Sequence, residues 1–123
     1  MTTYGPYKGR VLDWHDGDTC HMDVDLGFGF WLLAYNPITS KAVTSCRVYG
    51  IDTPEMTTQA GKDARVAGMA LCPGGTIVSV VSHGWDKYGG RFDGSILLPD
   101  GQDYATVMIA AGHGKEYFGG TKG

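Results

Sequence analysis

GRVLDWHDGDTCHMDVDL, residues 9–26, decides the fold of this chain. In its second half the apolar residues Cys20, Met22 and Val24 alternate with polar ones, which is the period of two expected of a strand with one face in water. Residues 9–14 form the preceding run, and HDGD between the two runs supplies typical turn residues. The stretch therefore predicts a β-hairpin made of residues 9–14 and 19–26.

The pattern downstream predicts three more strands and two helices. The strands are expected at residues 46–51, at the β-branched run 76–82 and at residues 92–98. A helix is expected over residues 57–71, with Ala60, Ala64, Ala67 and Leu71 on one face, and another over about 103–111, with Gly112 at its C-terminal cap. This order predicts an α+β, mainly β fold, a five-stranded Greek-key barrel of the oligonucleotide-binding (OB) type with two or three helices.

Composition agrees with a small barrel and limits the possible partners. The chain has 123 residues, of which 42% are hydrophobic, with 20 glycines and 5 prolines, so we expect one domain over residues 1–123 that is rich in turns. Its formal net charge of −3 is not that of a protein that coats nucleic acid through a general basic surface. Any binding of phosphate must depend on a few well-placed cations.

The cysteine pattern and the hydropathy indicate the compartment. Cys20, Cys46 and Cys72 form no C-x-x-C motif and are odd in number, so we expect reduced thiols in the core. No run approaches the 18 apolar residues of a membrane span, and the N-terminal stretch lacks the apolar segment of a signal peptide. We expect a cytoplasmic protein with no membrane partner, or a secreted one if a leader was removed; no pattern indicates an oligomeric state.

Residues 27–45 form an insert-like segment between the second and third predicted strands. We expect an extended hairpin arm with its turn at YNPITSK, residues 35–41. Its aromatic residues Phe28, Phe30, Trp31 and Tyr35 could stack on nucleic-acid bases, or they could serve the core or self-association; a structural role is favoured slightly.

Carboxylates gather at two predicted strand ends. Asp16 and Asp18 lie in the first turn, and Asp52 and Glu55 lie where the third strand ends. In a barrel such ends can meet, and hard oxygen ligands suit Ca²⁺, or Mg²⁺, rather than zinc. The predicted ligands are Asp18, Asp52 and the carbonyl of Thr53, with water in the remaining positions. Taken alone, DGD is more often only a polar turn.

Cations precede the second of these strand ends and occupy a later loop. Arg47 lies five residues before Asp52, so the two side chains emerge on opposite strand faces unless the strand end or a bulge reorients one of them. DKYGGRF, residues 86–92, brings Lys87, Tyr88 and Arg91 onto a glycine-rich loop where cations can converge on an anion. The alternatives are a structural ion pair of Arg47 and an ordinary hairpin turn.

Taken together, these motifs carry a family resemblance. DGDT at residues 16–19, R-x-x-x-x-DTPE at 47–55, KYGGR at 87–91 and Gly112-His113 with Tyr117 occur in this order. With them the chain resembles the staphylococcal nuclease-like (thermonuclease) family from about residue 11 to residue 117. The glycine-rich tail, residues 112–123, is similar to that of members carried by bacteriophages.

The resemblance implies a Ca²⁺-dependent phosphodiesterase that cuts DNA and RNA and leaves 3′-phosphate ends. Single-stranded or frayed nucleic acid would be its partner. The implied roles are metal ligation by Asp18, Asp52 and Thr53, support from the same turn by Asp16, activation of water by Glu55, contact with the scissile phosphate by Arg47 and Arg91, contact with the neighbouring phosphate by Lys87 and Tyr88, and contact with the nucleotide by Tyr117.

Three departures from the family pattern bear on this implication, and the first is the arm of residues 27–45, which is longer than a simple hairpin connection. The extra glycine in KYGGR displaces Arg91 by one residue, so a bulge is needed to bring it to the phosphate. The negative net charge predicts weak, salt-sensitive substrate binding. Two other functions therefore stand beside the nuclease: a non-catalytic OB-fold module that binds nucleic acid, and a structural viral protein that reuses the fold.

Overall fold

The first two strands form the hairpin that the sequence predicts. In the computed structural model, which describes residues 2–118, β1 (Tyr4–Asp16) pairs antiparallel with β2 (Thr19–Gly27). Along β2 the side chains of Cys20, Met22 and Val24 are buried while the residues between them are only partly covered. The alternation in the sequence thus selects the face of the strand that packs into the core.

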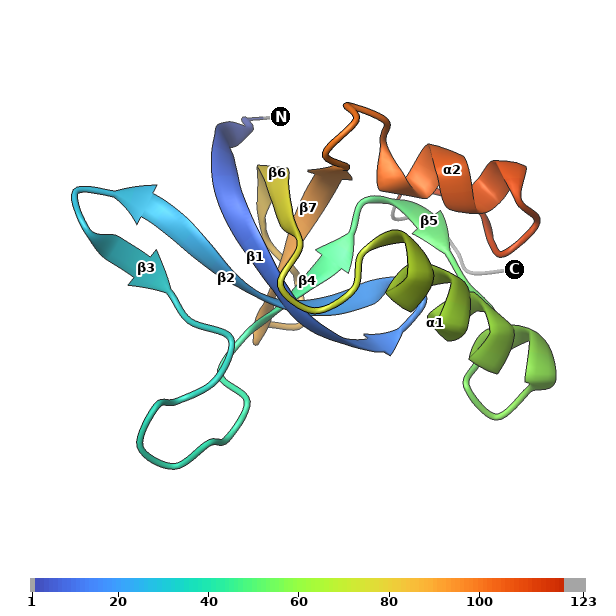
Figure 1. Ribbon diagram of the computed structural model, residues 1–123, viewed down its shortest axis with the longest axis horizontal. Coiled ribbons are helices and arrows are strands. Elements are labelled where there is room, and N and C mark those ends of the chain that lie inside the picture. Colours follow the sequence, from blue (N-terminus) through green and yellow to red (C-terminus); the bar gives the residue numbers. More distant parts are fainter. Residues whose placement is uncertain (1, 119–123) are drawn as a thin grey trace.

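Five strands close into a barrel (Figure 1). β6 (Ile77–Trp85) pairs with β1 and with β7 (Arg91–Leu97), and β4 (Ser45–Val48) joins β7 to β2. The β4–β7 pairing is parallel and the others are antiparallel. Within the described residues the architecture is α+β and mainly β, an OB-like barrel with two helices, as predicted.

The predicted third strand is divided into two. β4 ends at Val48, and β5 (Gly50–Asp52) leaves the barrel to pair with β8 (Lys115–Tyr117), a strand that the sequence analysis missed. Gly50 has a φ of +91°, a left-handed conformation that glycine adopts at little cost. The backbone therefore turns between Val48 and Ile51, and the residues after the turn no longer follow the face alternation of β4.

Both helices lie where the sequence predicts them. α1 (Gln59–Leu71) begins after Thr58, whose hydroxyl accepts a hydrogen bond from the amide of Gly61 at 3.0 Å. α2 (Tyr104–Ala110) follows the capping carboxylate of Asp103, and Gly112 beyond its end has a φ of +83°.

The predicted buried face of α1 is correct only in part. Ala64 is buried and Ala67 and Leu71 pack against the core, but Ala60 is exposed. Gly61 and Gly68 are buried instead, because close packing here leaves no room for a side chain.

The arm of residues 27–45 projects from the barrel (Figure 1). Its first part, β3 (Phe30–Leu32), extends the sheet beside β2, and a bridge between Tyr35 and Ala42 closes the predicted turn. Phe28 and Phe30 are largely exposed, so these two rings contribute little to the core.

The core contains the three cysteines as free, buried thiols, in agreement with the prediction. Burial raises the pKa of the Cys72 thiol to about 11 and raises those of Cys20 and Cys46 further. Among the described residues, neither helix has the length and hydropathy needed to cross a membrane.

Candidate functional site

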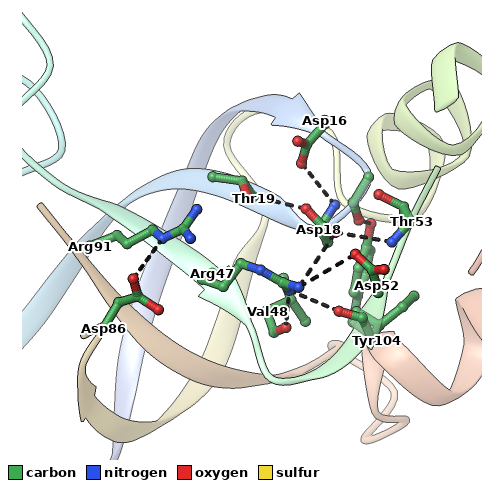
Figure 2. A network of polar contacts seen from close by, with 12 residues as sticks. Asp16, Asp18, Thr19, Arg47, Val48, Asp52, Thr53, Asp86, Arg91 and Tyr104 are labelled. Carbon is green, nitrogen blue, oxygen red and sulfur yellow. Dashed lines mark hydrogen bonds and ion pairs between the residues drawn. The ribbon is translucent and has the colours of Figure 1, made fainter. Parts of the chain in front are cut away.

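The turn between β1 and β2 meets the end of β5. Asp18 in this turn is 6% exposed, and one of its carboxylate oxygens, Oδ2, accepts a hydrogen bond from the amide of Thr53 at 3.0 Å (Figure 2). The turn is supported from below by Tyr104 of α2, whose hydroxyl donates to the carbonyl of Gly17 at 2.6 Å. Two predicted strand ends that are far apart in sequence are therefore in direct contact.

Arg47 lies between two buried carboxylates, Asp18 and Asp52, which we call the carboxylate pair. Its Nη2 atom is 3.7 Å from Asp18 Oδ2 and 3.8 Å from Asp52 Oδ1, and Asp52 is 5% exposed. Its Nη1 atom donates to the carbonyls of Val48 and Ile51, both at 2.8 Å. Arg47 thus bridges the break between β4 and β5, and this break is what brings Arg47 and Asp52 to the same side.

Asp16 and Asp18 differ in their electrostatic environment although they belong to one turn. Burial acts to raise the pKa of Asp18, but hydrogen bonding with Asp16, the Arg47 charge and the Thr53 amide hold it below its ordinary value. Burial and the neighbouring Asp18 raise the pKa of Asp16 to about 6. Asp16 Oδ1 also accepts a hydrogen bond from the amide of Asp18 at 3.1 Å, within the same turn.

A second feature is a cavity of about 650 Å³ between β4 and the loop that joins β6 to β7, which we call the cation cavity. It is lined by five of the predicted site residues: Arg47, Lys87, Tyr88, Arg91 and Tyr117. The guanidinium of Arg47 lies 5.7 Å from the centre of the Tyr117 ring, and Lys87 Nζ lies 5.2 Å from that of Tyr88. Three cations therefore face one opening, although the chain is acidic overall.

The glycine-rich loop brings Arg91 to this cavity despite its extra residue. Gly89 and Gly90 both have positive φ angles, +75° and +73°, and the pairing of β6 with β7 shifts register between Ser82 and Trp85. Arg91 is the first residue of β7, and its Nε atom lies 3.3 Å from Asp86 Oδ2. The register shift lies in β6 and not at the extra glycine, and Arg91 still lines the cavity.

Two acidic residues of the cation cavity were missed by the sequence analysis. Asp86 and Asp93 flank the KYGGR motif and line the cavity with the cations. Burial raises the pKa of Asp93, and the charge of Asp86 raises it further; the pKa of Asp86 is lowered, because the Tyr88 amide and Arg91 outweigh burial. The feature of the sequence that could have identified these two residues is their position beside Lys87 and Arg91.

Asp93→Asn is expected to stabilise the fold near pH 7 and to have no such effect near pH 3. The pKa of Asp93 is higher in the folded chain than its ordinary value of 3.8. The Asp93 carboxyl therefore contributes its full stability below pH 3.8, and this contribution is lost as the pH rises through the raised pKa of the folded state. Asparagine stays neutral throughout. Thermal denaturation at pH 3–8 would measure the difference in Tm; a constant difference across this range would contradict the expectation.

Glu55 lies in a different hollow from the cations. This hollow, of about 470 Å³, is lined by Glu55 together with Asp52, Thr53 and Lys115. Asp52 also contacts Arg47, so it stands between the hollow and the cation cavity. The predicted catalytic residues thus form two groups on either side of Asp52.

Gly61→Ala is expected to destabilise the protein by about 1–3 kcal/mol and to displace the backbone at Glu55. A Cβ atom at Gly61 would overlap the Glu55 carbonyl oxygen and lie 2.8 Å from that of Pro54. Chemical denaturation would measure the loss. Ala60→Gly, at the exposed neighbouring position, is the control and should cost no more than about 1 kcal/mol; equal losses would show that the contact with Glu55 is not the cause.

The ligand atoms at the carboxylate pair are of the chemical type that a hard cation binds. The available ligands are the carboxylates of Asp18 and Asp52 and the Thr53 carbonyl, all oxygen, as Ca²⁺ and Mg²⁺ prefer. The distances from Arg47 Nη2 to Asp18 Oδ2 and Asp52 Oδ1 both exceed the length of a hydrogen bond, so these two contacts do not fix the orientation of either carboxylate. Within residues 2–118 no three side chains of His, Cys, Asp or Glu are grouped to hold a metal, so water and phosphate would have to complete the coordination.

No protein-family model and no curated protein matches this chain.

Proposed function

We propose that this protein is a divalent-metal-dependent phosphodiesterase that hydrolyses nucleic acid, DNA or RNA, in single-stranded form. The observation that supports this best is that Arg47 contacts both members of the carboxylate pair and also lines the cation cavity. An anion held by Arg47 would therefore lie next to the only buried carboxylates among the described residues, Asp18 and Asp52. A binding protein has no need to bury carboxylates beside an anion that they repel.

The cations would neutralise the phosphate. Arginine suits this role because its planar guanidinium binds two oxygens at once and keeps its charge. Arg47 and Arg91 would contact the non-bridging oxygens at the scissile position, and Lys87 with the exposed Tyr88 would contact the next phosphate. The pairing of Arg91 with Asp86 keeps this arginine in place until a stronger anion displaces the carboxylate.

Asp18, Asp52 and the carbonyl of Thr53 would hold Ca²⁺ or Mg²⁺, with Asp16 supporting the turn. When bound, the ion would supply positive charge to the phosphate and acidify a bound water. Glu55 would accept the proton of the attacking water. Its hollow includes Asp52, which also contacts Arg47, so a water held by Glu55 would lie near the carboxylate pair.

The test is a digest of end-labelled single-stranded DNA by the full chain, with Ca²⁺, with Mg²⁺ and with chelator. We expect cleavage that requires a divalent ion, and products that end in 3′-phosphates. A digest of RNA under the same conditions would define the substrate range. Absence of cleavage with every divalent ion, while binding to the same DNA persists, would contradict the proposal.

A non-catalytic nucleic-acid-binding module is the second candidate. It is favoured by the separation of Glu55 from the cations, which line a different cavity. Under this alternative the chain would bind single strands in the presence of chelator as tightly as with Ca²⁺, and no digest would yield products.

A further inference from the structure

A third cavity lies at the end of the barrel opposite the turn between β1 and β2. It measures about 490 Å³ and is formed where β1 and β7 begin and where β2 and β6 end. We call it the barrel-end cavity; its lining includes Tyr4, Tyr7, Leu26, Leu32, Trp85 and Phe92. Its size is within the range of small-molecule sites, and none of the sequence-based roles involves it.

The wall of this cavity is apolar and partly aromatic. None of the described residues that line it carries a charge. Val24, Val80 and Phe92 are nearly completely buried and form the floor, while Tyr4 and Trp85 are 52% and 65% exposed at the rim. A phosphate would find no cation here, whereas a flat apolar group could lie against two accessible rings.

The barrel-end cavity adjoins the cation cavity. Neighbouring side chains of a strand point to opposite faces, so Phe92 lines the barrel-end cavity while Arg91 and Asp93 line the cation cavity. Trp85 lines both, because it lies where β6 enters the loop to Arg91. The two cavities therefore meet at the tip of the β6–β7 hairpin.

A single-stranded nucleic acid matches this pair of cavities. It has phosphates at regular intervals and bases that are free to stack on aromatic rings, whereas the bases of a duplex are covered by their neighbours. We propose that the barrel-end cavity binds an unpaired base of the strand whose phosphate occupies the cation cavity, stacked on Tyr4. This inference rests on the proposed function and adds to it a reason for selecting single strands.

Two other occupants are conceivable, a second copy of the chain and a protein partner. A base is favoured because the apolar cavity is continuous, through Trp85, with an opening that carries Lys87 and Arg91. A protein partner that filled the apolar cavity would need acidic groups at the same spacing as phosphates to use those cations.

The experiment measures binding of short oligothymidylates to the full chain at low salt with chelator, so that no cleavage occurs. An abasic site is placed at each position in turn. We expect one position at which the missing base weakens binding about tenfold, and a similar loss for Tyr4→Ala with the intact oligonucleotide. In Tyr4→Ala the same abasic site should cause no further loss, because the base has already lost its stacking partner.

Two variants serve as controls. Tyr4→Phe retains the ring and should restore wild-type binding. Val66→Ala removes an apolar side chain of similar exposure on α1, which lines neither cavity, and should leave binding unchanged. Circular dichroism would verify that Tyr4→Ala is folded.

The outcomes separate this inference from the proposed function. If the wild type cleaves single strands but no abasic site weakens binding, the base site alone is overturned. The same holds if the abasic site and Tyr4→Ala weaken binding independently of each other. Absence of binding to single strands would overturn both. Sedimentation that shows a dimer lost in Tyr4→Ala would assign the cavity to a second copy and would also overturn the base site.

Discussion

Replacing Glu55 by glutamine is expected to lower the rate of single-strand cleavage about 10²–10⁴-fold, the range typical of a general base. Glutamine keeps the size and polarity of the side chain but cannot accept the proton of water. Binding of the oligonucleotide should be retained, because Glu55 lies in the hollow beside Asp52 and not in the cation cavity. Single-turnover cleavage with saturating Ca²⁺ and equilibrium binding with chelator measure the two quantities separately.

The chain offers a matched control for this change. Glu116 is its other glutamate, is also exposed, and lies on β8 opposite Ile51. Glu116→Gln alters the net charge equally near the same strand and should leave the rate within about twofold of the wild type, as expected of a surface change remote from the chemistry. A rate for Glu55→Gln equal to that of Glu116→Gln would remove Glu55 from the reaction.

Replacing Arg47 by lysine should lower cleavage about 10²–10³-fold, the usual effect of removing one donor that stabilises developing charge. Lysine retains the charge but cannot donate to the carbonyls of Val48 and Ile51 while facing the carboxylate pair and the phosphate. Stability should also fall, by about 2 kcal/mol, since these bonds join β4 to β5. Cleavage assays and chemical denaturation would record both effects.

Arg65→Lys separates the two effects of the Arg47 change. Arg65, on α1, is also partly buried, and its Nε atom donates to the Trp14 carbonyl at 2.8 Å, so this substitution removes a similar bond away from both cavities. We expect it to lower stability and to leave cleavage unchanged. If cleavage in the two variants falls in proportion to stability, Arg47 has a structural role only.

The sequence predicted the barrel well because its signals are local. The alternation of residues 19–26, the β-branched run of β6 and Gly112 after α2 each specify an element from nearby residues. The division of the third strand was not predicted, because Tyr49 and Gly50 fit a continuous strand until the pairing of β5 with β8 is known.

The motifs in the sequence predicted which residues contribute to the candidate site, but they did not predict the distances between those residues. The meeting of Asp18 with Thr53 follows from barrel closure, and the structure brings them together. The separation of Glu55 from the cation cavity and the presence of Asp86 and Asp93 within it depend on side-chain packing, which the order of residues does not specify. The tail at residues 119–123, part of the resemblance to bacteriophage proteins, lies outside the described residues.

The pairing of β5 with β8 has a consequence for the timing of biosynthesis. Asp52 lies opposite Lys115 in this two-stranded ribbon, and all five barrel strands precede β8 in the chain. A nascent polypeptide that has left the ribosome only as far as residue 98 therefore contains every barrel strand but not the partner of β5. The ribbon that holds Asp52 is therefore completed only after residues 115–117 have been synthesised and have paired with β5.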